Sequence, residues 1–184
     1  MARKRRIIVY ISTSADGFIA RKDGSFDWLD RPRPKGNYGM GAFYKSIDTI
    51  LWGRKTYDLA VAFQREGKMA APFDPHLKHF LFSRTLSKST LAAGVELVEE
   101  PIPNFARRLR AQKGKDIWMM GGAGVIGSFL DAGVIDEFMI RVVPTMIGEG
   151  IPLVAGRRCT VPVKLVSCRK FPNGVVGLRY AVRR

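Results

Sequence analysis

The sequence predicts an α/β protein: a mixed, mostly parallel sheet flanked by helices, with an antiparallel hairpin at its C-terminal end. Short apolar runs typical of buried strands recur along the chain and alternate with segments of helical periodicity. Near the end, Pro172-Asn173-Gly174 separates two alternating apolar segments, and Asn-Gly in this position is the strongest short-range hairpin signal. With 184 residues, the chain is expected to form one domain over residues 1–184.

Turn residues bound each predicted element. The strands are expected at residues 7–13, 49–52, 79–83, 95–98, 117–120, 135–143, 163–170 and 175–182, with a short extended piece at 18–20. The helices are expected at residues 43–47, after the turn at 53–57, at 102–110 and around 125–130. Residues 21–34 are expected to form a loop.

The segment 116–131, DIWMMGGAGVIGSFLD, combines a buried strand, a glycine turn and the start of a helix. This geometry presents backbone N–H groups and a helix N-terminus to a phosphate. Gly122, Gly124 and Gly127 also fit the dinucleotide pattern G-x-G-x-x-G. The ordinary Rossmann plan expects an acidic residue about 20 positions later, and residues 140–146 contain none. A phosphate site of another kind and a turn that serves close packing alone are therefore both open.

The composition indicates a basic protein without a membrane span. Lys and Arg total 31 against 16 Asp and Glu, a net charge of +15 that would attract phosphorylated ligands or nucleic acid. The basic residues are dispersed, apart from residues 3–6, and no nucleic-acid-binding motif accompanies them. A solvated basic surface is favoured, and nucleic acid stays possible. No apolar run approaches a membrane span or the core of a signal peptide, so we expect a cytoplasmic protein whose Cys159 and Cys168 are free thiols.

Three predicted strands end in turns suited to phosphate: residues 53–56, 83–85 and 121–124. Ligands of open α/β sheets gather at the carboxyl ends of the strands. Arginines, a lysine, hydroxyls and backbone donors in two clusters beside a glycine turn suit an anion with separated phosphates, such as NADPH. Each cluster alone would be a solvated turn, whereas their common register at strand ends indicates one site.

The same segments resemble the dihydrofolate-reductase-like family. The motifs A-D-G-x-I, G-R-x-T, G-G-x-G and G-x-G-x-P-L begin at Ala15, Gly53, Gly121 and Gly148, and occur in the family's order. The chain is most similar to the branch that contains the reductase domain of the bacterial riboflavin-biosynthesis deaminase-reductase (RibD C-terminal domain). The resemblance extends from Ile7 to the C-terminal hairpin.

The resemblance implies an NADPH site and a homodimer. It assigns the nicotinamide end to Ala15, Asp16, Gly17 and Ile19, the pyrophosphate and adenosine phosphate to Gly53, Arg54, Lys55 and Thr56, the adenine and 2′-phosphate side to Ser83, Arg84 and Thr85, and closure over the diphosphate to Gly121, Gly122, Ala123, Gly124, Val125 and Ile126. It also implies a cis peptide bond between Gly121 and Gly122. The homodimer is expected because the related reductases pair their domains.

The substrate half departs from the family. The riboflavin-pathway reductase has a lysine, an aspartate and a glutamate at the positions of Tyr10, Ala60 and Met120, and residues 39–47 lack the acid by which dihydrofolate reductases bind substrate. The resemblance thus implies an NADP-dependent oxidoreductase that reduces an unidentified small heterocyclic or carbonyl/imine substrate. The alternative is a non-enzymatic nucleotide- or nucleic-acid-binding protein on the same fold.

Asp27 and Asp16 are the candidate catalytic residues. Burial of Asp27 against Phe26 and Trp28 would raise its pKa and suit a proton donor, although an aspartate that caps a local turn is equally consistent. Asp16 precedes a glycine turn, where a structural role is more common. The candidate substrate-binding residues are Trp28, Tyr57 and Glu149. No metal is expected, because the histidines at 76 and 79 and the two distant cysteines have no ligand spacing.

Overall fold

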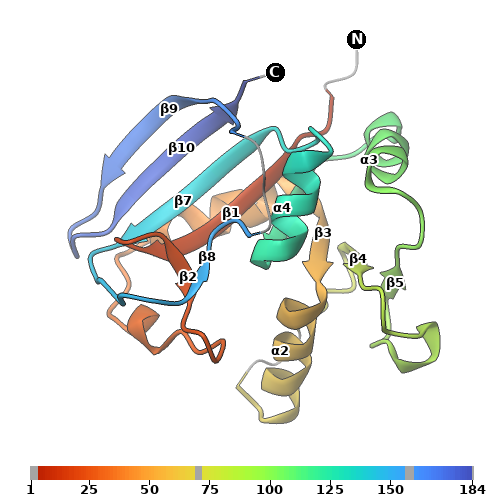
Figure 1. Ribbon diagram of the computed structural model, residues 1–184, viewed down its shortest axis with the longest axis horizontal. Helices are drawn as coiled ribbons and strands as arrows, with labels where there is room; N and C mark the ends of the chain where they lie inside the picture. Colours follow the sequence, from red (N-terminus) through yellow and green to blue (C-terminus); the bar gives the residue numbers. More distant parts are fainter. Residues whose placement is uncertain (1–3, 69–71, 156–159, 184) are drawn as a thin grey trace.

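The computed structural model describes residues 4–68, 72–155 and 160–183. Its centre is an eight-stranded sheet of order β5-β4-β3-β6-β1-β7-β10-β9, shown in Figure 1. In this order, the strands from β5 through β7 are all parallel to their neighbours. β10 pairs antiparallel with both β7 and β9. The strands are β1 (Ile7–Ser14), β3 (Ile47–Gly53), β4 (Lys78–Phe82), β5 (Val95–Leu97), β6 (Asp116–Gly121), β7 (Glu137–Val143), β9 (Val163–Lys170) and β10 (Val176–Val182). The predicted fold class is confirmed.

A second, two-stranded sheet pairs β2 (Phe18–Ala20) with β8 (Ile151–Pro152). The four α-helices in the described part of the chain are α1 (Met40–Lys45), α2 (Arg54–Arg65), α3 (Ile102–Ala111) and α4 (Ala123–Asp131). Three short 3₁₀ turns accompany them: η1 (Asp27–Leu29), η2 (Asn37–Gly39) and η3 (Lys88–Thr90). None of the described helices is long and apolar enough to cross a bilayer.

Two apolar layers hold the helices on opposite faces of the large sheet. On one face, Phe105 of α3 and Phe129 of α4 are fully buried in the same cluster as the β1 side chains of Ile7 and Val9. On the other face, Phe43 of α1 and Tyr57 of α2 pack with a separate cluster. Burial of one such aromatic side chain stabilises the fold by about 2–3 kcal/mol. The sheet is therefore a rigid base for the turns at its strand ends.

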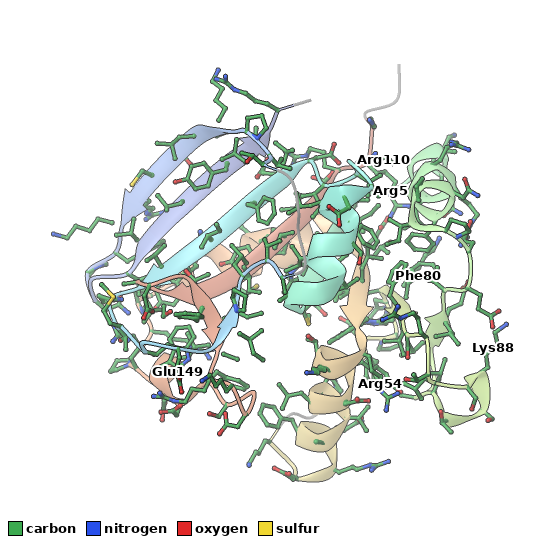
Figure 2. The ribbon with its side chains drawn as sticks, viewed as in Figure 1. Arg5, Arg54, Phe80, Lys88, Arg110 and Glu149 are labelled. Carbon is green, nitrogen blue, oxygen red and sulfur yellow. The ribbon has the colours of Figure 1, made fainter. Side chains whose placement is uncertain are left out.

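Basic residues of the N-terminal run are used inside the protein. Arg5 is 2% exposed and ion-pairs with Asp48, while its guanidinium also donates to Thr49 Oγ1 at 2.8 Å. Arg6 pairs with Asp116 at 2.6 Å, and this contact raises the pKa of Arg6. These pairs fasten β1, β3 and β6 together at the amino ends of the strands. Figure 2 shows Arg5 at the end of the sheet away from Arg54.

The loop that follows β2 folds back on the C-terminal hairpin. Trp28 is buried with Val143, Phe171 and Val175. The Asn173 side-chain amide, in the hairpin turn, donates to the Tyr38 hydroxyl at 2.6 Å. The apolar character that the sequence shows around residue 28 thus reflects a small core of its own, which fixes this loop over β7 and β10.

Candidate functional site

The three predicted phosphate turns meet at one edge of the sheet. β4, β3 and β6 are neighbours and parallel, so their carboxyl ends lie together. A Cβ on Gly53 would be 2.8 Å from Val125 Cγ1 and 2.9 Å from the Gly121 carbonyl oxygen. Arg54 Nη1 donates to Thr85 Oγ1 at 3.2 Å. The first turn therefore contacts both of the others, as the sequence predicted.

Helices α2 and α4 both begin at this edge. Gly53 and Gly122 occupy their N-cap positions, neither provides a side-chain cap, and no acidic residue lies in either first turn. The N–H groups without a side-chain cap and the dipoles of two helices thus favour an anion here. The Gly121–Gly122 peptide bond is cis, which confirms the expectation, and Gly121 has φ +114°. In Figure 1, the starts of α2 and α4 lie at the same end of the sheet.

Cationic and hydroxyl groups surround these amides. Arg54 is held by Asp58, one helical turn along α2, at 2.6 Å. The Ser83 hydroxyl accepts the backbone N–H of Thr85 at 3.2 Å, which orders the turn after β4. Lys55 and Arg84 are exposed. Thr56 faces the other turn: its hydroxyl oxygen is 3.5 Å from the position of a Cβ on Gly122.

A cavity of about 270 Å³ opens beside Arg54. Tyr57 lines it from the side of α2, and Leu86 and Thr90 line it from the segment after β4. Tyr57 is 3% exposed, and its hydroxyl accepts the backbone N–H of Ala92 at 2.8 Å. Tyr57 lies among residues that border the cationic turns, and its contact with substrate stays a prediction.

The segment 15–19 connects β1 to the small sheet. Gly17 has φ +90°, and its carbonyl accepts the N–H of Leu153 at 3.1 Å. Asp16 Oδ2 accepts the N–H groups of Ile147 and Gly148 at 3.0 and 2.7 Å. A hydrogen bond from the Ser14 hydroxyl, together with these backbone bonds, lowers the pKa of Asp16. Asp16 thus holds the turn after β7 as an ionised acceptor, and its catalytic role stays a prediction.

Asp27 differs from the expectation. Its side chain is 65% exposed and pairs with Arg21 at 2.7 Å, and this hydrogen bond lowers the pKa of Asp27. The expected burial and raised pKa are wrong because η1 directs its neighbour Trp28 inward and leaves Asp27 beside a cation. Glu149 is likewise exposed and ion-pairs with Lys22. Trp28 lies in the loop core with Val143, Phe171 and Val175. It lines neither the cavity beside Arg54 nor the second cavity described below.

A second cavity, of about 150 Å³, was not predicted from the sequence. It lies over β1 and β7, beneath the loop that carries η2. Its lining residues are Tyr10, Ser12, Leu29, Arg31, Arg33, Asn37, Tyr38, Met40, Arg141, Val143 and Val175. The available signal was Arg141, a charged residue that interrupts the apolar run of β7.

The sheet order and the facing G-R-x-T and Gly-Gly turns are those of a dihydrofolate-reductase-like fold. The chain belongs to the RibD C-terminal domain family, whose sequence model matches residues 5–177.

Several relatives are similar over nearly the whole chain. The protein YwjB of Bacillus subtilis (strain 168), described as uncharacterized, is 34% identical over 94% of this chain and 95% of its own length. YyaP of the same organism, also described as uncharacterized, is 33% identical over 97% of this chain and 95% of its own. A crystal structure of a putative riboflavin biosynthesis protein from Shewanella sp. PV-4 superposes with a TM-score of 0.84 at 26% identity, covering 97% of this chain and 99% of that chain.

The bifunctional enzyme of the pathway shares the fold. The diaminohydroxyphosphoribosylaminopyrimidine deaminase/5-amino-6-(5-phosphoribosylamino)uracil reductase of Thermotoga maritima superposes with a TM-score of 0.69 at 15% identity, over 98% of this chain and 57% of that chain. This chain therefore corresponds to part of that protein. The family supports a reductase of the riboflavin-biosynthesis type by resemblance.

Proposed function

We propose that this protein is an NADPH-dependent reductase that transfers a hydride to a small heterocyclic or carbonyl/imine acceptor. The observation that carries the proposal is the meeting of Gly53, the Arg54–Thr85 contact and the cis Gly121–Gly122 turn at one sheet edge. An isolated glycine turn needs no ligand. Three turns with two uncapped helix N-termini and two arginines form a site for a multiply charged anion.

The described residues fit NADPH. No side chain other than hydrogen can stand at Gly53 without moving the opposite backbone, so the two turns can approach a diphosphate closely. The amides at the starts of α2 and α4 would hold the diphosphate, and Arg54, Arg84 and the adjoining hydroxyls would hold the adenosine phosphate. The abundance of cations on this side favours NADPH over NADH. The coenzyme would supply a hydride when bound.

The protein's own contribution is to hold the acceptor, exclude water and keep the loop after β1 in place. Asp16 serves the last task through its two backbone hydrogen bonds. Because Tyr10, Ala60 and Met120 replace the acidic and basic residues of the riboflavin-pathway reductase, we propose a different acceptor. Turnover of 5-amino-6-(5-phosphoribosylamino)uracil by the purified protein would instead assign it the pathway reaction.

Fluorescence titration with NADPH tests the proposal. We expect micromolar binding by the unmodified protein. Arg54→Ala should weaken it about 10-fold or more, because a charge-assisted hydrogen bond contributes about 1.5–3 kcal/mol. Arg108→Ala is the matched control: Arg108 lies on α3, is similarly exposed and pairs with a carboxylate, Glu100, so its loss should leave the affinity unchanged.

Two results would contradict the proposal. One is a protein that binds no NADPH at millimolar concentration. The other is an Arg54→Ala variant that binds it as well as the Arg108→Ala control. Salt-sensitive binding to DNA in the absence of NADPH affinity would support the nucleic-acid-binding alternative.

The proposed oligomer is a homodimer. Strand β9 lies at an open edge of the sheet and exposes Val163, Leu165 and Val166, each more than 40% accessible. An apolar edge strand is a common surface for self-association. Light scattering coupled to size-exclusion chromatography should give twice the monomer mass, and Leu165→Lys should shift it toward the monomer if this edge forms the contact.

A further inference from the structure

The second cavity is a pocket of positive charge on the face of the sheet that carries α1. Arg141 of β7 lies at its base, and Arg31 and Arg33 of the loop after η1 lie at its wall. In the described part of the chain, no carboxylate lies within ion-pair distance of these three arginines. By contrast, Arg5, Arg6 and Arg54 each pair with an acid.

Arg141 is the most buried of the three, at 8% exposure. Its guanidinium carbon lies 4.8 Å from the centre of the Tyr10 ring and 5.7 Å from that of Phe171. Its Nη2 donates to the Tyr38 carbonyl at 3.0 Å, and its Nε is buried without a hydrogen-bond partner. The head group is thus fixed between aromatic rings, and its buried Nε donor is unused.

Arg31 repeats this pattern at the wall of the pocket. Its Nη2 donates to Thr145 Oγ1 at 3.2 Å, and its Nε is also buried without a partner. A buried charge without a counter-ion costs several kcal/mol unless something compensates it. Aromatic and carbonyl contacts would satisfy a purely structural arginine in part, but they leave both Nε donors and two net charges uncompensated. An oxyanion in the cavity would supply the missing counter-charge.

The pocket adjoins the glycine turn. β1 pairs with β6 in the register Ile7↔Ile117 and Val9↔Met119, so the residues of β1 that follow Val9 run toward the glycine turn. Neighbouring strands are about 4.8 Å apart. A Cβ on Gly121 would lie 3.7 Å from the Ile11 side chain, which confirms that the two segments are in contact. Ser12 lines the pocket, so a ligand there would lie next to the proposed coenzyme site.

From this arrangement we propose that the pocket of Tyr10, Arg31, Arg33 and Arg141 binds an oxyanion, a carboxylate or a phosphate ester, carried by the hydride acceptor. Its volume of about 150 Å³ suits such a group with a small ring attached. The inference rests on the proposed reductase function only in naming the ligand a hydride acceptor; the anion site itself does not depend on it.

Isothermal titration calorimetry with benzoate, phenyl phosphate and the neutral benzamide tests the pocket, in the presence of saturating NADP⁺ so that the phosphate turns are filled. We expect at least one anion to bind, and benzamide to bind about 10-fold more weakly or not at all. The better of the two anions identifies the group. Arg141→Gln should weaken that anion about 10-fold or more, and Arg108→Gln, which removes the same charge from α3, should not.

Equal affinities for benzoate, phenyl phosphate and benzamide would overturn the proposal, as would a folded Arg141→Gln variant with unchanged affinity. If thermal unfolding shows that Arg141→Gln does not fold, the exposed Arg33→Gln decides: we expect a loss of about 3-fold or more, and no loss would overturn the proposal. The anion titration can be repeated without the coenzyme. A protein that binds the anions but not NADP⁺ would contradict the proposed reductase function and leave the anion site supported.

Discussion

Replacement of Gly53 by alanine tests the geometry at the centre of the site. The backbone at Gly53 has φ −84°, which any residue adopts, so the effect of the substitution is steric. The new Cβ would lie 2.8 Å from Val125 Cγ1, 2.9 Å from the Gly121 oxygen and 3.0 Å from the Gly122 nitrogen. Ordinary contacts begin near 3.4 Å, and two of the three opposing atoms are backbone. The two turns must therefore separate.

Overpacking of this kind costs about 1–3 kcal/mol of unfolding free energy. Urea unfolding followed by fluorescence of the buried Trp52 and Trp118 should show this loss, and NADPH titration should show affinity reduced about 10-fold or more. Gly41→Ala is the matched control, because Gly41 lies in α1 and a Cβ added there would have no atom within 4 Å. Alanine there should be neutral or stabilising by up to about 1 kcal/mol. A Gly53→Ala variant as stable and as competent as Gly41→Ala would refute the contact between the turns.

Further outcomes follow from single side chains. Arg5→Met should cost about 3–5 kcal/mol in urea unfolding because it strands a partly buried carboxylate, whereas Arg108→Met, which removes an exposed pair, should cost less than about 1 kcal/mol. Burial lowers the pKa of His79 below its ordinary 6.5, so its contribution to stability should be complete above that pH and lost as the pH falls below it; urea midpoints from pH 8 to 5 should show a drop that His79→Gln reduces. Asp27→Asn should leave the urea midpoint nearly unchanged, and a large shift in the acidic limb of a rate profile would restore a catalytic role to that residue.

Local signals predicted most of the fold. Strand-length apolar runs and helical periodicity identified all the strands of the large sheet and its four helices. Gly174 in the hairpin turn has φ +84°, as the Asn-Gly pair indicated. The pairing of β2 with β8 was not predictable, because β8 has two residues and its partner lies far away in sequence.

The meeting of the three turns proposed for the coenzyme was predictable because each turn carries its own motif and the parallel order of strands brings them together. The cavity proposed for the acceptor was not predictable. Its arginines are separated by about a hundred positions, and only packing shows that Arg31 and Arg141 share a cavity. The predicted burial of Asp27 was wrong for a related reason. Apolar neighbours in the sequence do not show which side of a single turn faces solvent, nor that Arg21 lies beside Asp27.

The order of strands places the two proposed binding sites on different parts of the sheet. The turns proposed for the coenzyme follow β3, β4 and β6, whereas the second cavity is built on β1, β7 and the loop of residues 29–40. If the proposed roles hold, exchange of side chains on that loop would alter which acceptors bind and leave the turns proposed for the coenzyme unchanged. A lineage that keeps one half and varies the other can acquire new chemistry by a handful of substitutions, and a directed library confined to the loop is the natural place to look for it.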